Sequence, residues 1–243
     1  MFAKTKEVAA EAASEAAKVA AAIQSFDSGT LNWVEAAFQS ASSTKAPTAT
    51  TTDDEEKSDK QPLAAITEAE VIQCQAAWAN AIKTCSKIYL EGGDYVGAAT
   101  TAASELYGYG HSEVLFKPTK AAEFPFRPTG GEAMSYFVGG EVVKDGYAED
   151  RGFAINGGKG WSEVVFDNHG IVLNDSIAIA MGEYIFTCAT SGEESKVEYT
   201  FGYKRNADGK ARIFLHHSSV PYQELRTVAS CPSFTTPSSA HWA

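Results

Sequence analysis

The stretch Arg212-Ile213-Phe214-Leu215-His216-His217-Ser218-Ser219-Val220-Pro221 combines a strand-like pattern with reactive side chains. It predicts a β-strand, because a turn signal at residues 206–209 precedes it and Pro221 ends it. Side chains alternate between the faces of a strand, so His217 and Ser219 share one face and His216 and Ser218 share the other. Either face therefore delivers one imidazole and one hydroxyl group into the same space, a pair suited to moving protons.

The region upstream of this strand begins with two predicted helices. Apolar residues recur at three- and four-residue intervals from Val71 to Tyr89, which indicates a long amphipathic helix starting near Glu68. Gly92-Gly93 ends this helix, and Asp94 is a candidate N-cap for a second helix that runs to residue 108.

Extended segments dominate the rest of the chain. In chain order they are a short strand at 114–119, an extended segment at 132–138, strands at 162–167 and 170–173 around a turn at 168–169, and long strands at 176–189, 196–205 and 212–220. A helix pair followed by an antiparallel meander predicts an α+β fold, with helices packed on one face of a curved antiparallel sheet.

Composition divides the chain into three parts. Residues 1–60 combine an Ala-rich helical segment with a Ser/Thr-rich linker that carries the acidic run 53–56, and the linker is expected to be disordered. Residues 61–228 are expected to form the folded domain, and residues 229–243 a flexible tail.

The net charge of −11 argues against nucleic acid or an anionic membrane as a partner, since both require a basic surface. No apolar run approaches the roughly 18 residues of a membrane span, so no membrane insertion is expected, and no secretory signal is visible. Cys74 and Cys85 would lie roughly 16 Å apart on one helix, too far for a disulfide. Together with Cys188 and Cys231, they are expected to be small buried side chains in a reducing compartment.

The order of elements resembles the cone-shaped fold of nuclear transport factor two and ketosteroid isomerase. Residues 215–221 look like the end of the association (hub) domain of calcium/calmodulin-dependent kinase, where a His-Arg-Ser-Gly segment precedes a proline at the same distance. The most specific resemblance is to the iota class of carbonic anhydrase, found in algae and bacteria. Residues 115–119, 135–140 and 216–219 carry this match, which covers roughly residues 68 to 225.

The resemblance implies reversible hydration of carbon dioxide to bicarbonate. In metal-free members of the family, a Thr, a Tyr and a Ser beside a His hold bicarbonate, which implies Thr119, Tyr136, Ser219 and His217 here. His217 is preferred because it aligns with the Arg that points into the pocket of hub domains, although His216 and Ser218 form the same pair on the other face. The hydroxyl groups would donate to oxygens that gain charge, and the His would accept a proton.

No metal and no cofactor are expected. A catalytic metal needs about three converging ligands, and the adjacent His216 and His217 point to opposite faces of their strand. Two alternatives remain: a non-catalytic, hub-like oligomerisation module, or a ketosteroid-isomerase-like enzyme whose carboxylate base would be Asp150 or Glu183. A homodimer is expected, because an open sheet leaves a broad face to cover. The expected compartment is a plastid if the chain is algal, and the cytoplasm otherwise.

Overall fold

The structure, a computed structural model, describes residues 63–222. The predicted segment 1–60 and the tail 229–243 lie outside these residues. The elements are α3 (Glu68–Leu90), α4 (Tyr95–Leu106), β1 (Leu115–Lys117), α5 (Gly130–Val138), the 3₁₀ helices η1 (Gly140–Val142) and η2 (Phe153–Gly158), β2 (Trp161–Asn174), β3 (Ile177–Cys188), β4 (Glu194–Arg205) and β5 (Ala211–Ser219).

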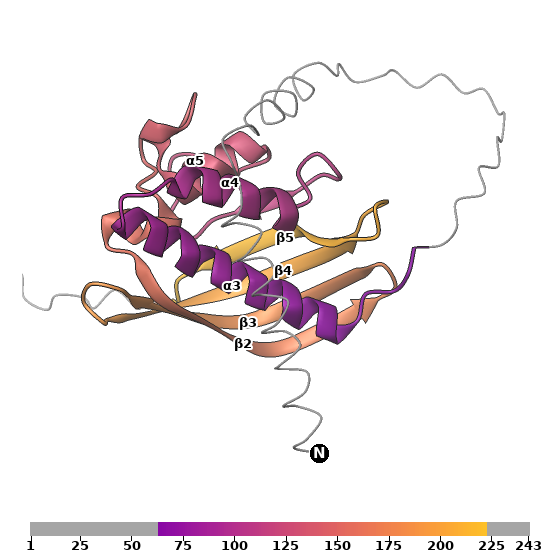
Figure 1. The fold of residues 1–243 in the computed structure, drawn as a ribbon. Helices are drawn as coiled ribbons and strands as arrows, with labels where there is room; N and C mark the ends of the chain where they lie inside the picture. The colour runs from indigo at the N-terminus through magenta and orange to yellow at the C-terminus, as the bar shows by residue number, and fades with distance from the viewer. Residues whose placement is uncertain (1–62, 223–243) are drawn as a thin grey trace, which may run out of the picture.

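The strands form one curved sheet in the order β1-β5-β4-β3-β2. Strands β2 to β5 are joined as an antiparallel meander, and the short β1 adds in parallel to β5. The helices α3, α4 and α5 lie on the same side of the sheet (Figure 1). The predicted α+β cone fold is therefore confirmed, and β5 lies between β1 and β4 rather than at an edge.

The two predicted helices are present, and side-chain caps start both of them. Thr67 and Glu70 form a capping box at the start of α3, and Asp94 accepts a hydrogen bond from the backbone of Gly97 at the start of α4. The apolar stripe of α3 faces the sheet and places the buried Trp78 at its centre.

The prediction of an extended segment at 132–138 is wrong, because these residues belong to the helix α5. Thr129 and Glu132 form a second capping box there. Every residue from Ala133 to Val138 is buried, so the segment lacks the polar face that gives a helix its recognisable period.

The predicted turn at 168–169 is also wrong, because β2 runs through it as one strand with a bulge between Asn168 and Gly170. The chain turns later, at Asp175, whose φ of 49° lies in the left-handed region. The bulge requires glycine opposite it, since a Cβ on Gly182 would lie 2.1 Å from the backbone oxygen of Asp167.

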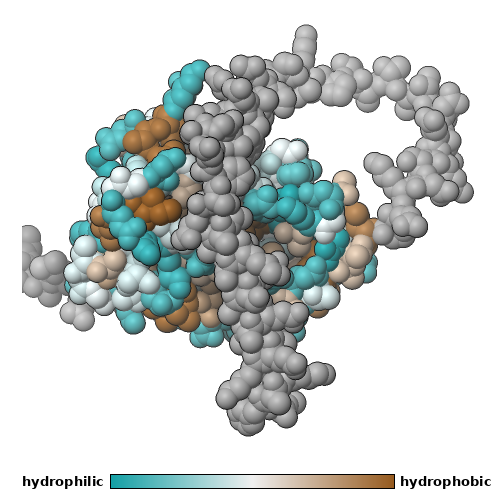
Figure 2. All heavy atoms as spheres, in the orientation of Figure 1, coloured by the Kyte–Doolittle hydropathy of each residue, from teal (hydrophilic) through white to brown (hydrophobic). Residues whose placement is uncertain are grey.

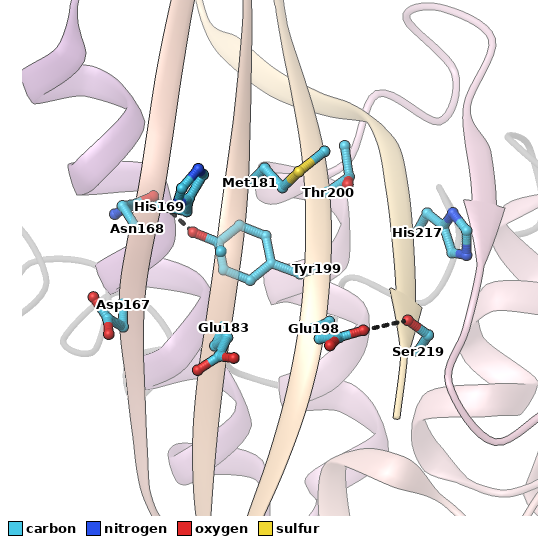
Figure 3. Close-up of a pocket in the computed structure, with 11 residues that line it drawn as sticks. Asp167, Asn168, His169, Met181, Glu183, Glu198, Tyr199, Thr200, His217 and Ser219 are labelled. Atoms are coloured by element: carbon cyan, nitrogen blue, oxygen red, sulfur yellow. Dashed lines mark hydrogen bonds between the residues drawn. The ribbon is translucent and has the colours of Figure 1, made fainter. Parts of the chain in front are cut away.

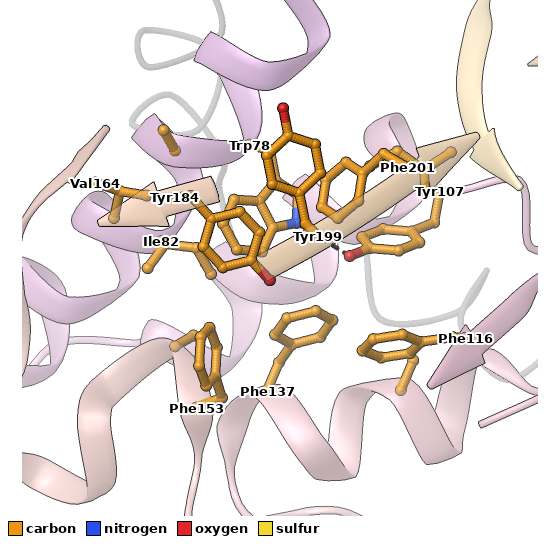
Figure 4. Packing of buried hydrophobic residues seen from close by; sticks show 14 of the residues in the cluster. Trp78, Ile82, Tyr107, Phe116, Phe137, Phe153, Val164, Tyr184, Tyr199 and Phe201 are labelled. Atoms are coloured by element: carbon orange, nitrogen blue, oxygen red, sulfur yellow. Dashed lines mark hydrogen bonds between the residues drawn. The ribbon is translucent and has the colours of Figure 1, made fainter. Parts of the chain in front are cut away.

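The space between helices and sheet is filled mostly by aromatic rings. Figure 4 shows Trp78 of α3 above Phe137 of α5, with Tyr107 and Tyr184 directing their hydroxyl groups into the space between them. On the side of the molecule in Figure 2, hydrophilic and hydrophobic residues are interspersed where the surface is coloured. Among the described residues, no helix is both long and apolar enough to cross a bilayer.

Candidate active site

The histidine and serine that enter the interior from β5 are His216 and Ser218. Both are buried, with exposed fractions of 2% and 3%. The ring of His216 stacks on Phe116 of β1, at a centroid distance of 4.7 Å, and packs edge-on against Phe201 of β4 at 4.1 Å. These apolar neighbours on both flanking strands determine which face of β5 is internal.

The predicted placement of His217 and Ser219 is therefore corrected. Both lie on the outer face of the sheet, where Thr200 pairs with His217 and Glu198 with Ser219 in the register of β4. The Ser219 hydroxyl donates to the Glu198 carboxylate over 3.3 Å. The predicted pair of an imidazole and a hydroxyl is present in the interior, but it consists of His216 and Ser218 on the opposite face of β5.

Thr119 and Tyr136, the other predicted site residues, are brought together. Thr119 follows β1, and its buried hydroxyl has no hydrogen-bond partner among the described residues. Tyr136 projects from α5, and burial raises the pKa of its phenol, so that the group stays protonated. The nearby Thr119 side chain and the backbone amide of Lys120 act in the opposite direction and lower the pKa of Tyr136, but the effect of burial is larger.

Tyr184 of β3, which was not predicted as a site residue, joins this group. Its hydroxyl lies 3.5 Å from Nε2 of His216, and that nitrogen lies 3.2 Å from the hydroxyl of Ser218. Burial raises the pKa of Tyr184, while the side chains of Ser218 and Thr119 oppose the shift. The available signal was its alternation in phase with the buried Ala178 and Ala180 on the same strand.

We call Thr119, Tyr136, Tyr184, His216 and Ser218 the hydroxyl cluster. It gathers neutral hydroxyl groups from α5, β3, β5 and the segment after β1 inside an aromatic shell, with Tyr184 and Ser218 next to the imidazole. A buried hydroxyl without a partner, like that of Thr119, is costly unless a ligand completes it. The arrangement is therefore suited to a small molecule that offers several hydrogen-bond acceptors.

A buried ion pair holds two parts of the cluster in position. The guanidinium of Arg127 donates to both carboxylate oxygens of Asp150 over 2.6 and 2.9 Å, and Ser135 of α5 donates to the same carboxylate over 2.5 Å. The backbone amide of Arg127 donates to the backbone oxygen of Phe116 on β1. This network connects the segment that carries Thr119 to the helix that carries Tyr136.

The carboxylates considered for a ketosteroid-isomerase-like base lie elsewhere. Asp150 accepts hydrogen bonds from Arg127 and Ser135. Glu183 lies on the outer face of the sheet, where it forms an ion pair with Lys196 at 2.7 Å. Within residues 63–222, no three His, Cys, Asp or Glu side chains are grouped so that they could hold a metal ion. Cys74, Cys85 and Cys188 are free thiols, and Cys231 lies outside the described residues.

The outer face of the sheet carries a separate, open hollow of about 670 Å³ that contains His217 and Ser219. Figure 3 shows Asp167, Glu183 and Glu198 in a row across β2, β3 and β4, directly opposite one another in the strand register. The hollow therefore differs from the hydroxyl cluster in both charge and exposure.

Comparison with known proteins identifies one family. Residues 69–220 match the family described as metal-independent carbonic anhydrase. A metal-independent carbonic anhydrase from Nostoc sp. (strain PCC 7120) is 36% identical over 167 residues, which cover 66% of this chain and 76% of that protein.

Solved structures are similar as well. The crystal structure of an iota-carbonic anhydrase from a cyanobacterium, complexed with bicarbonate, has a TM-score of 0.61 and 35% identity over 68% of this chain and 99% of that one. A putative dehydratase of the NTF2-like family from Streptomyces avermitilis aligns with a TM-score of 0.39 and 13% identity, over 63% of this chain and 95% of that one. The family match spans most of the folded domain, and this chain therefore belongs to the metal-independent carbonic anhydrase family.

Proposed function

We infer that the chain catalyses the reversible hydration of carbon dioxide to bicarbonate, without a metal, at the hydroxyl cluster. The observation that carries this inference is the gathering of buried hydroxyl groups beside one imidazole, with the Thr119 hydroxyl left without a hydrogen-bond partner among residues 63–222. Family membership supports it, since the related structure from a cyanobacterium is a complex with bicarbonate.

Hydrogen-bond donation to the developing bicarbonate is the central chemical task. As water attacks carbon dioxide, charge moves onto the carbon dioxide oxygens, and a donor fixed in position stabilises that charge more than it stabilises the neutral substrate. Thr119, Tyr136 and Ser218 are assigned this role. Their setting favours it, because burial keeps the phenol of Tyr136 protonated and the surrounding rings exclude water that would compete for the donors.

Metal independence is chemically reasonable for this substrate. Carbon dioxide is a good electrophile, so an apolar site that orients a water molecule and stabilises the product can accelerate hydration without a Lewis acid. In this assignment, the hydroxyl donors take over the charge stabilisation that zinc supplies in other carbonic anhydrases.

The test is carbon dioxide hydration by the purified full chain, measured by stopped flow before and after prolonged dialysis against a strong chelator. Activity should survive chelation and fall at least a hundredfold in Tyr136→Phe, which retains the ring and removes the hydroxyl. Tyr222→Phe, at an exposed tyrosine, is the matched control and should leave the rate unchanged. Loss of activity on chelation, with recovery on adding zinc, would refute the metal-independent assignment.

We also propose that the chain forms a homodimer through the outer face of the sheet. Val165, Val172, Ile179 and Met181 are exposed there, on β2 and β3, although large apolar side chains gain free energy when covered. The same face carries the carboxylate row and the lysines of β4, so a second copy could offset charge as well as cover apolar area.

Sedimentation velocity of the full chain at micromolar concentration tests the dimer. A dimer should dissociate in Met181→Glu, which adds a charge to the proposed interface. Leu63→Glu, at an exposed leucine outside the sheet, is the control and should leave the dimer intact. A monomeric wild type would contradict the proposal.

A further inference from the structure

We propose that Trp78 and Tyr107 hold His216 in its Nε2–H tautomer, so that the imidazole donates to Ser218 instead of acting as the general base. This inference rests on the proposed function, because it assigns a role to the histidine of the same cluster. Trp78 and Tyr107 are positioning residues in it, since they act through His216.

A buried chain of hydrogen bonds leads from α3 to the imidazole. The indole Nε1–H of Trp78 donates to the hydroxyl oxygen of Tyr107 over 3.0 Å, and this oxygen lies 2.7 Å from Nδ1 of His216. All three side chains are about 2% exposed. Solvent therefore cannot replace a missing partner at any point of the chain.

The first bond in this chain determines the direction of the second. An indole nitrogen can only donate, so the Tyr107 oxygen is an acceptor towards Trp78. The Tyr107 proton must then point elsewhere, and Nδ1 of His216 is the only other partner found for it among the described residues. If Nδ1 carried the proton instead, the buried Tyr107 hydroxyl would lose its acceptor, at the cost of an unsatisfied polar group.

The protonation of Nε2 follows from the role of Nδ1 as an acceptor. A neutral imidazole whose Nδ1 accepts must carry its proton on Nε2. Nε2 then donates to the Ser218 oxygen over 3.2 Å, with the Tyr184 oxygen farther away at 3.5 Å. Because one acceptor position of Ser218 is thereby occupied, the Ser218 proton is free to point towards the ligand.

The surroundings of His216 keep it neutral. Phe116, Phe201 and Tyr107 pack around the ring, and among residues 63–222 its hydrogen-bond partners are all hydroxyl groups. Burial, with a smaller contribution from the neighbouring His217, lowers the pKa of His216 well below its ordinary value. A neutral His216 with its proton on Nε2 has no free lone pair facing the cluster, so the proton that the attacking water loses as bicarbonate forms must pass to a solvent water molecule or a buffer base rather than to His216.

Nitrogen-15 NMR of the full chain determines the tautomer of His216 directly. Long-range ¹H–¹⁵N spectra distinguish a protonated from an unprotonated ring nitrogen, and the His216→Gln spectrum identifies the signals. We expect an unprotonated Nδ1 and a protonated Nε2 in the wild type. A protonated Nδ1 in the wild type would overturn the inference, whether or not the protein hydrates carbon dioxide.

Tyr107→Phe and Trp78→Phe then test the chain. Tyr107→Phe should populate both tautomers and lower kcat about tenfold or more, the size of effect seen when a metal-binding histidine loses its orienting partner. Trp78→Phe should have the same effect to a smaller degree. Trp161→Phe is the matched control, because it also removes a buried indole that donates its N–H, in this case to the backbone oxygen of Phe153.

The control separates positioning from folding. Trp161→Phe should lower the melting temperature without changing the tautomer. If Tyr107→Phe retains a fully protonated Nε2 and the wild-type kcat, the inference is wrong. If the wild type has the expected tautomer but no hydratase activity, the hydrogen-bond chain stands and the proposed function fails.

Discussion

The two faces of β5 carry the same chemical groups in opposite surroundings. His216 and Ser218 are sealed among aromatic rings, whereas the adjacent His217 and Ser219 lie in an open, acidic hollow. A hydrogen bond or a charge counts for more where water cannot compete, so the inner pair is the one suited to catalysis. Position relative to the sheet, rather than residue type, therefore separates a buried pair from a surface pair.

The largest expected contrast is between the ion pairs on the two sides of the sheet. Asp150→Ala removes the bidentate partner of the fully buried Arg127, which keeps only the longer contact of 3.4 Å with Glu149, and should lower the free energy of unfolding by about 3 to 5 kcal/mol. Glu183→Ala breaks the exposed pair with Lys196 and should cost no more than about 1 kcal/mol. Urea titration of both variants measures the loss of unfolding free energy in each. Equal losses would contradict the burial of the Arg127–Asp150 pair.

The next contrast is catalytic. Ser218→Ala removes a donor to the developing bicarbonate and should slow hydration about a hundredfold or more, equivalent to about 2.7 to 4 kcal/mol. Ser219→Ala, one residue away on the outer face, should remain within a factor of two. Stopped-flow assays of both variants at matched melting temperature decide the register. The reverse ranking would restore the original prediction.

A smaller effect concerns pH and stability. The folded state holds the pKa of His216 well below its ordinary value of about 6.5, so the unfolded chain binds a proton first as the pH falls. The free energy of unfolding is therefore unaffected by His216 above about pH 6.5. Below that pH it falls by up to about 1.4 kcal/mol per pH unit, because only the unfolded chain binds the proton. His216→Gln should flatten this part of the curve of unfolding free energy against pH, and an unchanged slope would show that His216 titrates normally.

The smallest expected effect is that of removing residues 1–60. Their composition offers little apolar area to bury, so a chain beginning at residue 61 should melt within a few degrees of the full chain and retain its activity. Differential scanning calorimetry and the hydration assay check this expectation. A large fall in melting temperature would mean that the segment packs on the domain.

Local patterns were sufficient for much of the fold. The apolar period of residues 71–89 predicted α3, Asp94 was identified as a cap, and the alternation in the later strands predicted the meander. The failures have local causes as well. α5 is buried on all sides and so lacks a helical period, although the capping box of Thr129 and Glu132 was a usable signal, and the bulge in β2 resembles a turn in sequence.

The sequence by itself determined that an imidazole and a hydroxyl would share a face of β5, and that Thr119 would follow a short strand ended by proline. It could not determine which face is internal, because a period of two is equally consistent with both. Only the tertiary structure decided this, by placing Phe116 and Phe201 on either side of His216. The hydrogen-bond chain from Trp78 through Tyr107 likewise joins residues far apart in sequence, so only the packing of α3 against the sheet creates it.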